Sequence, residues 1–169
     1  MSDLVKKTHI VPFINTGDVS EEWTQFKKST AFTLNMNPQT VTRDFISEEL
    51  PHTELDHYQP SLAQSLTMFK GEPDYQTVFD MLYDRATGEK AHRDILIVFY
   101  KETATYTPGE PEAEATTVYK AWKIDSLLQL SALDSVAGTI DFDLNFNTIK
   151  NGAVDMKTGK PKFIPGKFD

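Results

Sequence analysis

Thr139-Ile-Asp-Phe-Asp-Leu-Asn-Phe-Asn-Thr-Ile149 is the stretch that decides the fold class. Apolar and polar residues alternate strictly within it. The apolar set is Ile140, Phe142, Leu144 and Phe146, and the polar set is Asp141, Asp143, Asn145 and Asn147. Successive side chains of a β-strand point to opposite faces, so this pattern predicts a strand with one packed face and one polar face.

Several other segments are rich in β-branched and aromatic residues, as strands are. Residues 93–105 and 116–125 each predict one strand. Residues 31–36 and 41–46 predict two strands joined by a turn that contains Pro38. Residues 54–69 predict a strand that is interrupted at Pro60, because proline cannot donate to a strand ladder.

One segment has helical periodicity instead, and we predict a helix over 73–87 that begins near Pro73 and Asp74. Gly88 stands where a left-handed residue would end it. Its apolar stripe consists of Tyr75, Val78, Phe79, Leu82 and Ala86. The predicted class is therefore mainly β (α+β), a β-sandwich or barrel of about six to eight strands with one flanking α-helix.

Composition limits the classes of function. The 169 residues carry 25 acidic against 17 basic side chains, a formal net charge of −8, and include no cysteine. Disulfide scaffolds, thiolate metal sites and cysteine nucleophiles are thereby excluded. Wrapping of nucleic acid by a basic face is disfavoured, because it requires clustered Lys and Arg. We expect no membrane span, since no apolar run approaches about 20 residues, and no secretory signal, since the first seven residues lack an apolar core.

Patterns that carry chemistry are weak in this chain. Asp141-Phe-Asp-Leu-Asn145 begins like a calcium-binding EF-hand loop, but Phe146 stands where that loop needs glycine. His52 and His57 lie close in sequence, yet along a strand they would point to opposite faces, which is poor geometry for a shared metal. Nucleophile-elbow and phosphate-loop motifs do not occur. We therefore expect no catalytic residues, no metal and no cofactor, and a structural or binding role.

We expect one domain over 1–169 with two appendages. The Pro/Glu-rich loop 106–115 carries the acidic residues Glu110, Glu112 and Glu114. The segment 151–169 is locally basic and is either a frayed terminus or an extended arm that docks on a neighbouring subunit near such acidic residues. The predicted arm residues are Lys160, Lys162, Phe163, Ile164, Lys167 and Phe168.

Three motifs resemble the major tail (tail tube) proteins of long, non-contractile-tailed bacteriophages. The first is the N-P-x-T turn at 37–40. The second is Thr53-Glu-Leu-Asp-His-Tyr-Gln-Pro-Ser61, which has one residue fewer between the threonine and the acid than the family pattern. The third is Gly71-Glu-Pro73, which opens the helix. In element order the resemblance covers most of the chain.

The resemblance implies a virion protein, made in the cytoplasm of a host bacterium, that forms rings of six copies. The rings would stack into a tube, meet other tail proteins such as tape measure and terminator, and deliver double-stranded DNA without sequence-specific binding or membrane contact. On this reading we predict that Asp141, Asp143, Asn145 and Asn147 line the lumen, where acidic walls repel phosphates. The alternatives are a small-molecule-binding β-barrel and a capsid decoration or secretion-tube protein.

Overall fold

Strands dominate the computed structural model, which describes residues 4–17, 19–109 and 114–168. The strands are β1 (Ile10–Asn15), β2 (Trp23–Gln25), β3 (Ser29–Asn35), β4 (Pro38–Arg43), β5 (His52–Tyr58), β6 (Ser61–Thr67), β7 (His92–Tyr106), β8 (Thr116–Asp134), β9 (Thr139–Asp155) and β10 (Lys162–Pro165). The helices among these residues are α1 (Pro73–Asp84) and the short 3-10 turns η1 (Lys7–His9) and η2 (Gly88–Ala91). The predicted class, mainly β with one flanking α-helix, is confirmed.

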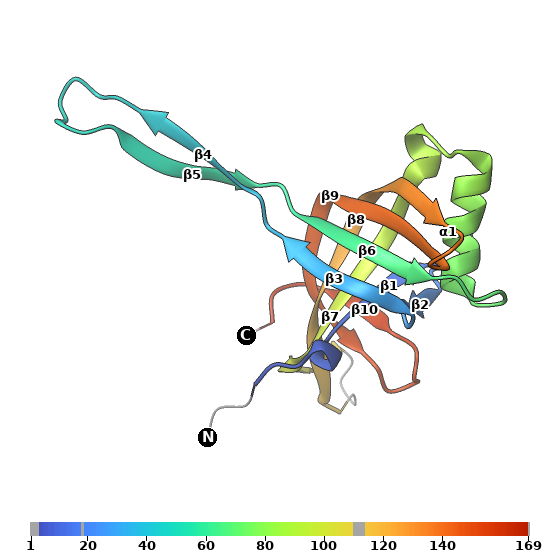
Figure 1. Cartoon of the computed structure of the whole chain (residues 1–169). Helices are drawn as coiled ribbons and strands as arrows, with labels where there is room; N and C mark the ends of the chain where they lie inside the picture. Colours follow the sequence, from blue (N-terminus) through green and yellow to red (C-terminus); the bar gives the residue numbers. More distant parts are fainter. Residues whose placement is uncertain (1–3, 18, 110–113, 169) are drawn as a thin grey trace.

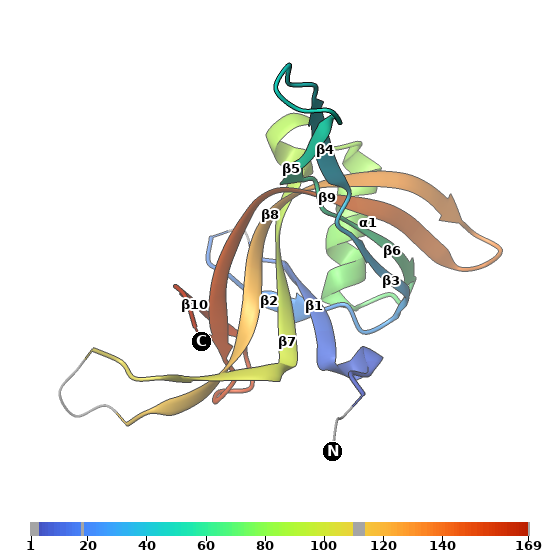
Figure 2. The same ribbon diagram turned by 90° about the vertical axis from the view of Figure 1, so that its left-hand side faces the viewer.

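The main sheet is antiparallel and curls into a half-barrel (Figures 1 and 2). Its strands follow the order β2-β1-β7-β8-β9-β6-β3, and β10 pairs with β9. The register shifts once between β7 and β8, and twice between β8 and β9. Such bulges bend a strand and increase its twist, so they account for the curl of the three longest strands.

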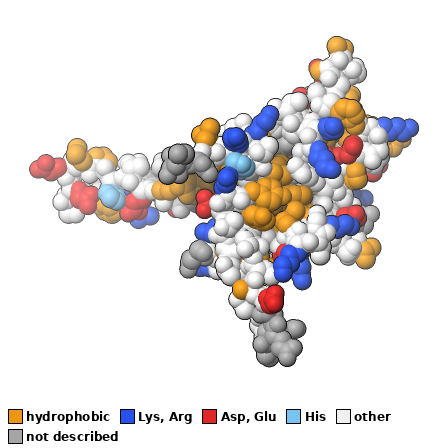
Figure 3. All heavy atoms as spheres, turned by 90° about the horizontal axis from the view of Figure 1, so that it is seen from below, with side chains coloured by type: hydrophobic (Ala, Val, Ile, Leu, Met, Phe, Trp, Pro, Cys, Tyr) orange, Lys and Arg blue, Asp and Glu red, His pale blue; other side chains and the backbone are white. Residues whose placement is uncertain are grey.

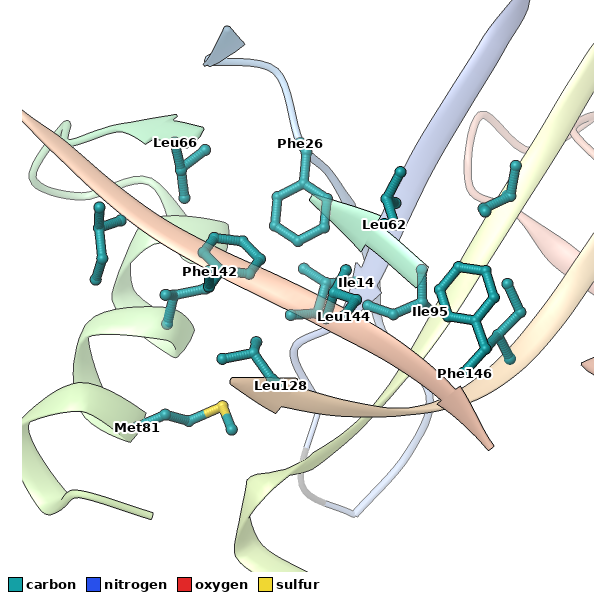
Figure 4. Packing of buried hydrophobic residues seen from close by; sticks show 14 residues of the cluster. Ile14, Phe26, Leu62, Leu66, Met81, Ile95, Leu128, Phe142, Leu144 and Phe146 are labelled. Atoms are coloured by element: carbon teal, nitrogen blue, oxygen red, sulfur yellow. The ribbon is translucent and has the colours of Figure 1, made fainter. Parts of the chain in front are cut away.

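The core fills the inside of this curl. The predicted packed face of β9 is confirmed, because Ile140, Phe142, Leu144 and Phe146 are all buried in one cluster. Figure 4 shows Phe142 and Leu144 among side chains from β1, β6, β7, β8 and α1. Across the sheet, Leu144 stands opposite Leu62 of β6 and Leu128 of β8. The alternation seen in the sequence therefore sets which face of the sheet is inside.

Helix α1 packs against the same core through a stripe that differs in part from the predicted one. Val78 and Met81 are its buried hydrophobic residues. Of the predicted stripe, Tyr75, Leu82 and Ala86 are only partly buried against the cluster. The Phe79 ring lies instead between two tyrosine rings of the helix, with centroids at 5.8 and 6.2 Å.

The end of the helix also differs from the prediction. Pro73 is the first residue, as expected, but Asp84 is the last. Arg85, rather than Gly88, takes the left-handed conformation there, with φ at 50°. Its backbone N–H donates to the Leu82 carbonyl oxygen at 3.1 Å, which satisfies one of the free carbonyls of the last turn.

The two strands predicted over 31–46 are present as β3 and β4, but they do not pair with each other. β3 pairs with β6 in the main sheet, whereas β4 pairs with β5 in a separate two-stranded sheet. The predicted interruption at Pro60 is confirmed, since β5 ends at Tyr58 and β6 begins at Ser61. Asn35 of β3 and Ser61 of β6 are paired, so the chain leaves and re-enters the main sheet at one point. The residues between them, which we call the β4–β5 hairpin (38–58), extend far from the body (Figure 1).

The basic C-terminal segment is more regular than an extended arm. β10 runs antiparallel to β9, with Phe163 opposite Val154 and Ile164 opposite Ala153. Phe163 packs against a cluster that includes Val154, and both Ile164 and Phe168 pack against a cluster that includes Ala153. The apolar residues predicted to dock on a neighbour therefore cover this chain's own sheet.

Candidate assembly surfaces

The β4–β5 hairpin is exposed along its whole length. All residues of β4 and of β5 are exposed. They include large apolar side chains, and the loop between the strands adds Ile46 and Leu50, which are 108% and 77% exposed. The remaining exposed apolar residues of the hairpin are Val41, Phe45, Leu55 and Tyr58. An apolar surface of this extent on a projecting element is typical of an interaction site.

Local polar contacts hold the hairpin in register and fix its base. The Thr42 and Thr53 hydroxyls lie 3.0 Å apart across the two strands. At the base, Asn37 has a positive φ of 45°, which asparagine tolerates better than most residues. Its Nδ2 donates to the Gln59 carbonyl oxygen and to the Ser61 hydroxyl, both at 3.1 Å. These bonds tie the entry of the hairpin to its exit.

The two histidines of the hairpin bind neighbouring carboxylates rather than each other. His52 Nε2 lies 3.3 Å from a Glu54 oxygen, and His57 Nδ1 lies 2.6 Å from an Asp56 oxygen. Within the part of the chain that the structure describes, no three His, Cys, Asp or Glu side chains are grouped so that they could hold a metal ion.

The polar face of β9 lies opposite the core. Asp143 and Asn147 are exposed, whereas Asp141 and Asn145 are half-buried. The Ser65 hydroxyl donates to Asp141 Oδ1 at 2.6 Å, and Asn145 Nδ2 donates to Gln129 Oε1 at 2.7 Å. The structure therefore brings the four predicted lumen residues onto one polar surface. Whether that surface lines a lumen stays a prediction.

The glutamates of the predicted acidic loop and the lysines of the predicted basic arm are exposed wherever the structure describes them. Glu110 and Glu112 lie outside the described residues, and Glu114 is exposed. Lys160, Lys162 and Lys167 are exposed as well. Pairing of these charges between two subunits stays a prediction.

Both ends of the main sheet have open edges. β3 is the last strand at one end, and β2, only three residues long, is the last at the other. An open edge presents backbone N–H and C=O groups that can pair with another chain. No sequence pattern marks these edges, because they follow from the strand order.

One buried carboxyl group lies at the start of α1. Asp74 is 2% exposed, and its Oδ1 accepts a hydrogen bond from the Tyr75 backbone N–H at 2.8 Å. Burial raises the pKa of Asp74, and the nearby Glu72 adds to this, whereas the backbone hydrogen bond and Lys27 act in the opposite direction. The residue lies in the first turn of α1, directly after Pro73.

The interior of the half-barrel does not resemble a ligand-binding barrel. Its largest fully buried side chains include Phe142, Leu62 and Ile95, which occupy the space a ligand would need (Figure 4). An apolar cleft of about 630 Å³ does open at the surface, between the end of α1 and β8. Among the described residues, no helix is long and apolar enough to span a membrane.

Comparison with known proteins gives similarity of fold only. No family model matches the sequence, and no curated protein matches it. Several solved structures are similar over most of their length. The anti-feeding prophage cap, a tube-terminating cap, has a TM-score of 0.48 at 11% identity and covers 90% of this chain and 93% of that one.

The tail of an empty GTA particle with C6 symmetry also has a TM-score of 0.48, at 9% identity, and covers 88% of this chain and 98% of that one. A sheath/tube terminator of the PVC extracellular contractile injection system has a TM-score of 0.47, at 10% identity, and covers 88% and 96%. Identities of this size do not indicate a common function. The non-contractile tail type stays a prediction.

Proposed function

We propose that this protein is the structural subunit of a phage-type tail tube, in which identical copies form stacked rings and the tube delivers DNA. The main support for this proposal is the fully exposed β4–β5 hairpin. A two-stranded hairpin is marginally stable in water unless a third strand or another surface packs on it. Among the described residues, β4 and β5 pair with each other alone and all their residues are exposed, so the apolar side chains of the hairpin are free to pack against a second molecule.

Open sheet edges support association between identical copies. Within the described part of the chain, β3 pairs with β6 alone, so a second copy can extend the sheet at that edge. A contact between two different surfaces of the same protein repeats from copy to copy and generates either closed rings or open stacks. The open edge at β3 and the projecting hairpin provide two separate contacts between copies. A stack of rings requires two, one within each ring and one between neighbouring rings.

The polar face of β9 supports the part of the proposal that concerns DNA. Asp141 and Asp143 carry negative charge on a surface with no lysine or arginine at the neighbouring positions of β6, where Ser61, Ala63 and Ser65 stand. A wall of this kind repels phosphate groups, so a DNA duplex passes without binding.

Deleting the hairpin tests the assembly. Residues 36–60 are replaced by Asn-Gly, which connects the paired strands β3 and β6 as an ordinary hairpin turn. We expect a folded monomer by sedimentation velocity and no rings or tubes by electron microscopy, whereas the full chain assembles. As a matched pair of point variants, Ile46→Ser is expected to weaken assembly and Val136→Ser, on another exposed turn, is not. Tubes formed without the hairpin would contradict the proposal.

Charge reversal tests the lumen. Tubes of Asp141→Lys/Asp143→Lys assembled with short duplex DNA are expected to retain it in a nuclease-resistant form at low salt and to release it at high salt. Asp80→Lys/Asp84→Lys changes the net charge equally on exposed helix positions and should leave any bound DNA open to nuclease. If DNA retained by the Asp141/Asp143 variant is digested, the lumen assignment fails.

A further inference from the structure

A groove runs along the seam where the two ends of the curled sheet approach each other. It has a volume of about 680 Å³ and lies between β1, the second strand from one end of the sheet, and β3, the last strand at the other end. A backbone hydrogen bond of 3.2 Å from Phe26 N–H to the Pro12 carbonyl oxygen joins β1 to the segment before β3. We call this feature the seam groove (Lys7–Pro12 and Gln25–Phe32).

Apolar side chains form part of the seam groove. Val11 and Phe26 are buried beside it, at 7% and 5% exposure, and Phe32 lies at its edge with 39% exposure. β3 is irregular here, since its register against β6 shifts between Ser29 and Phe32. The groove therefore combines apolar and polar lining along an open sheet edge, a surface suited to a segment with both apolar and charged side chains.

The charge of the seam groove is entirely positive. The groove segments 7–12 and 25–32 contain three lysines, at positions 7, 27 and 28, and no Asp or Glu. Lys7 and Lys27 line the groove itself. Lys28 lies over the Phe69 ring at 5.1 Å, and Lys27 also acts on the Asp74 carboxyl group.

The β4–β5 hairpin has the complementary charge. One arginine and five carboxylates lie within 38–58, which gives a net charge of −4 with neutral histidines, against +3 for the groove segments 7–12 and 25–32. Asp44, Glu48 and Glu49 stand next to the exposed Phe45, Ile46 and Leu50 at the far end. Acidic side chains are visible along the projecting arm at the left of Figure 3.

The two features lie at opposite ends of one strand. β3 begins at Ser29 beside the seam groove and ends at Asn35, from which the hairpin departs. The strands of the hairpin, six and seven residues long, reach roughly 20 Å beyond the body. A contact between them thus joins two copies head to tail and leaves a free hairpin and a free groove for further copies.

We propose that the seam groove receives the acidic end of the β4–β5 hairpin of a second copy of this chain. The proposal rests on the proposed function and names the surface that the hairpin binds. Apolar side chains of the hairpin end enter the groove, and its carboxylates face Lys7 and Lys27. The cleft between α1 and β8, a more apolar surface, has Arg85 as its one charged lining residue.

A charge swap in the full-length protein tests the pairing. Glu48→Lys/Glu49→Lys and Lys7→Glu/Lys27→Glu should each raise the critical concentration for assembly by about tenfold or more, because attractive pairs become repulsive. Combining all four substitutions should restore assembly to within about threefold of wild type. Normal assembly of the groove variant, or no rescue in the combined variant, would overturn the groove as the receptor.

Cross-linking distinguishes this failure from failure of the proposed function. The chain has no cysteine, so single cysteines can be placed at Ile46, at Thr30 in the groove and at Ser131 in the cleft. A short bis-maleimide should join Ile46→Cys to Thr30→Cys and not to Ser131→Cys. Linkage of Ile46→Cys to Ser131→Cys alone would overturn the groove as the receptor of the hairpin, but it would still support self-assembly. If the wild-type protein stays monomeric and Ile46→Cys is linked to neither Thr30→Cys nor Ser131→Cys, both the groove as receptor and the proposed self-assembly are overturned.

Discussion

Replacing Phe142 by alanine should destabilise the protein more than any change on the opposite face of β9. The Phe142 side chain is 1% exposed, and its ring centroid lies 5.9 Å from that of Phe26. Removing a buried phenylalanine side chain loses its transfer free energy and leaves a cavity, a cost of about 3–5 kcal/mol. For a domain of this size that lowers the melting temperature by about 6–20 °C.

Urea unfolding followed by tryptophan fluorescence measures this loss, because Trp122 packs edge-on against Phe99 at 5.2 Å in the same half-barrel. Asp143→Ala is the matched control, since Asp143 is adjacent on the strand and exposed; it should change the free energy of unfolding by less than about 0.5 kcal/mol. A loss below about 1 kcal/mol for Phe142→Ala, or equal losses in the two variants, would refute the assignment of the faces.

Two further predictions concern packing and titration. Gly152→Ala should cost about 1–3 kcal/mol in urea unfolding, because a Cβ there would overlap the Ile164 carbonyl oxygen and the Phe163 ring; Gly109→Ala, in open space, should be neutral, and equal effects would contradict the packing of β10. Burial raises the pKa of Asp74 above its ordinary 3.8. The folded state therefore keeps the carboxyl proton to a higher pH than the unfolded state does. As a result, the contribution of Asp74 to the free energy of unfolding falls as pH rises from 3.8 through the raised pKa. Asp74→Asn should therefore gain stability relative to wild type between pH 4 and pH 7 in thermal melts, and an unchanged difference would contradict it.

Strong local periodicity predicted the parts of the fold that depend on one face of one element. The alternation of Ile140 to Asn147 set the inside and outside of the sheet, and the position of Pro60 separated two strands. The helix was predicted from spacing, but its most buried apolar residues include Met81 rather than Phe79, because the approach of the helix to the sheet determines which part of a wide apolar stripe is covered.

Pairing between distant segments was not predictable in the same way. Residues 31–46 have the composition of a hairpin, yet β3 takes β6 as its neighbour, and a partner that far along the chain leaves no local signal. The two assembly surfaces depend on this pairing. Moving β4 and β5 off the main sheet creates the projecting hairpin, and placing β3 at the end of the sheet creates the seam groove. The charges of the hairpin and of the groove segments can be counted in the sequence, but the positions of these segments relative to each other cannot be predicted from it.

The single exit point of the hairpin, between the paired residues Asn35 and Ser61, has an evolutionary consequence. Substitutions, insertions or deletions within 38–58 remove no side chain from the core, so this segment can vary without a loss of folding stability. Recognition of a neighbour can then diversify quickly while the half-barrel stays unchanged. In related chains, we expect this segment to differ in length and charge far more than β6 and β9, with compensating changes in the lysines of 7–12 and 25–32.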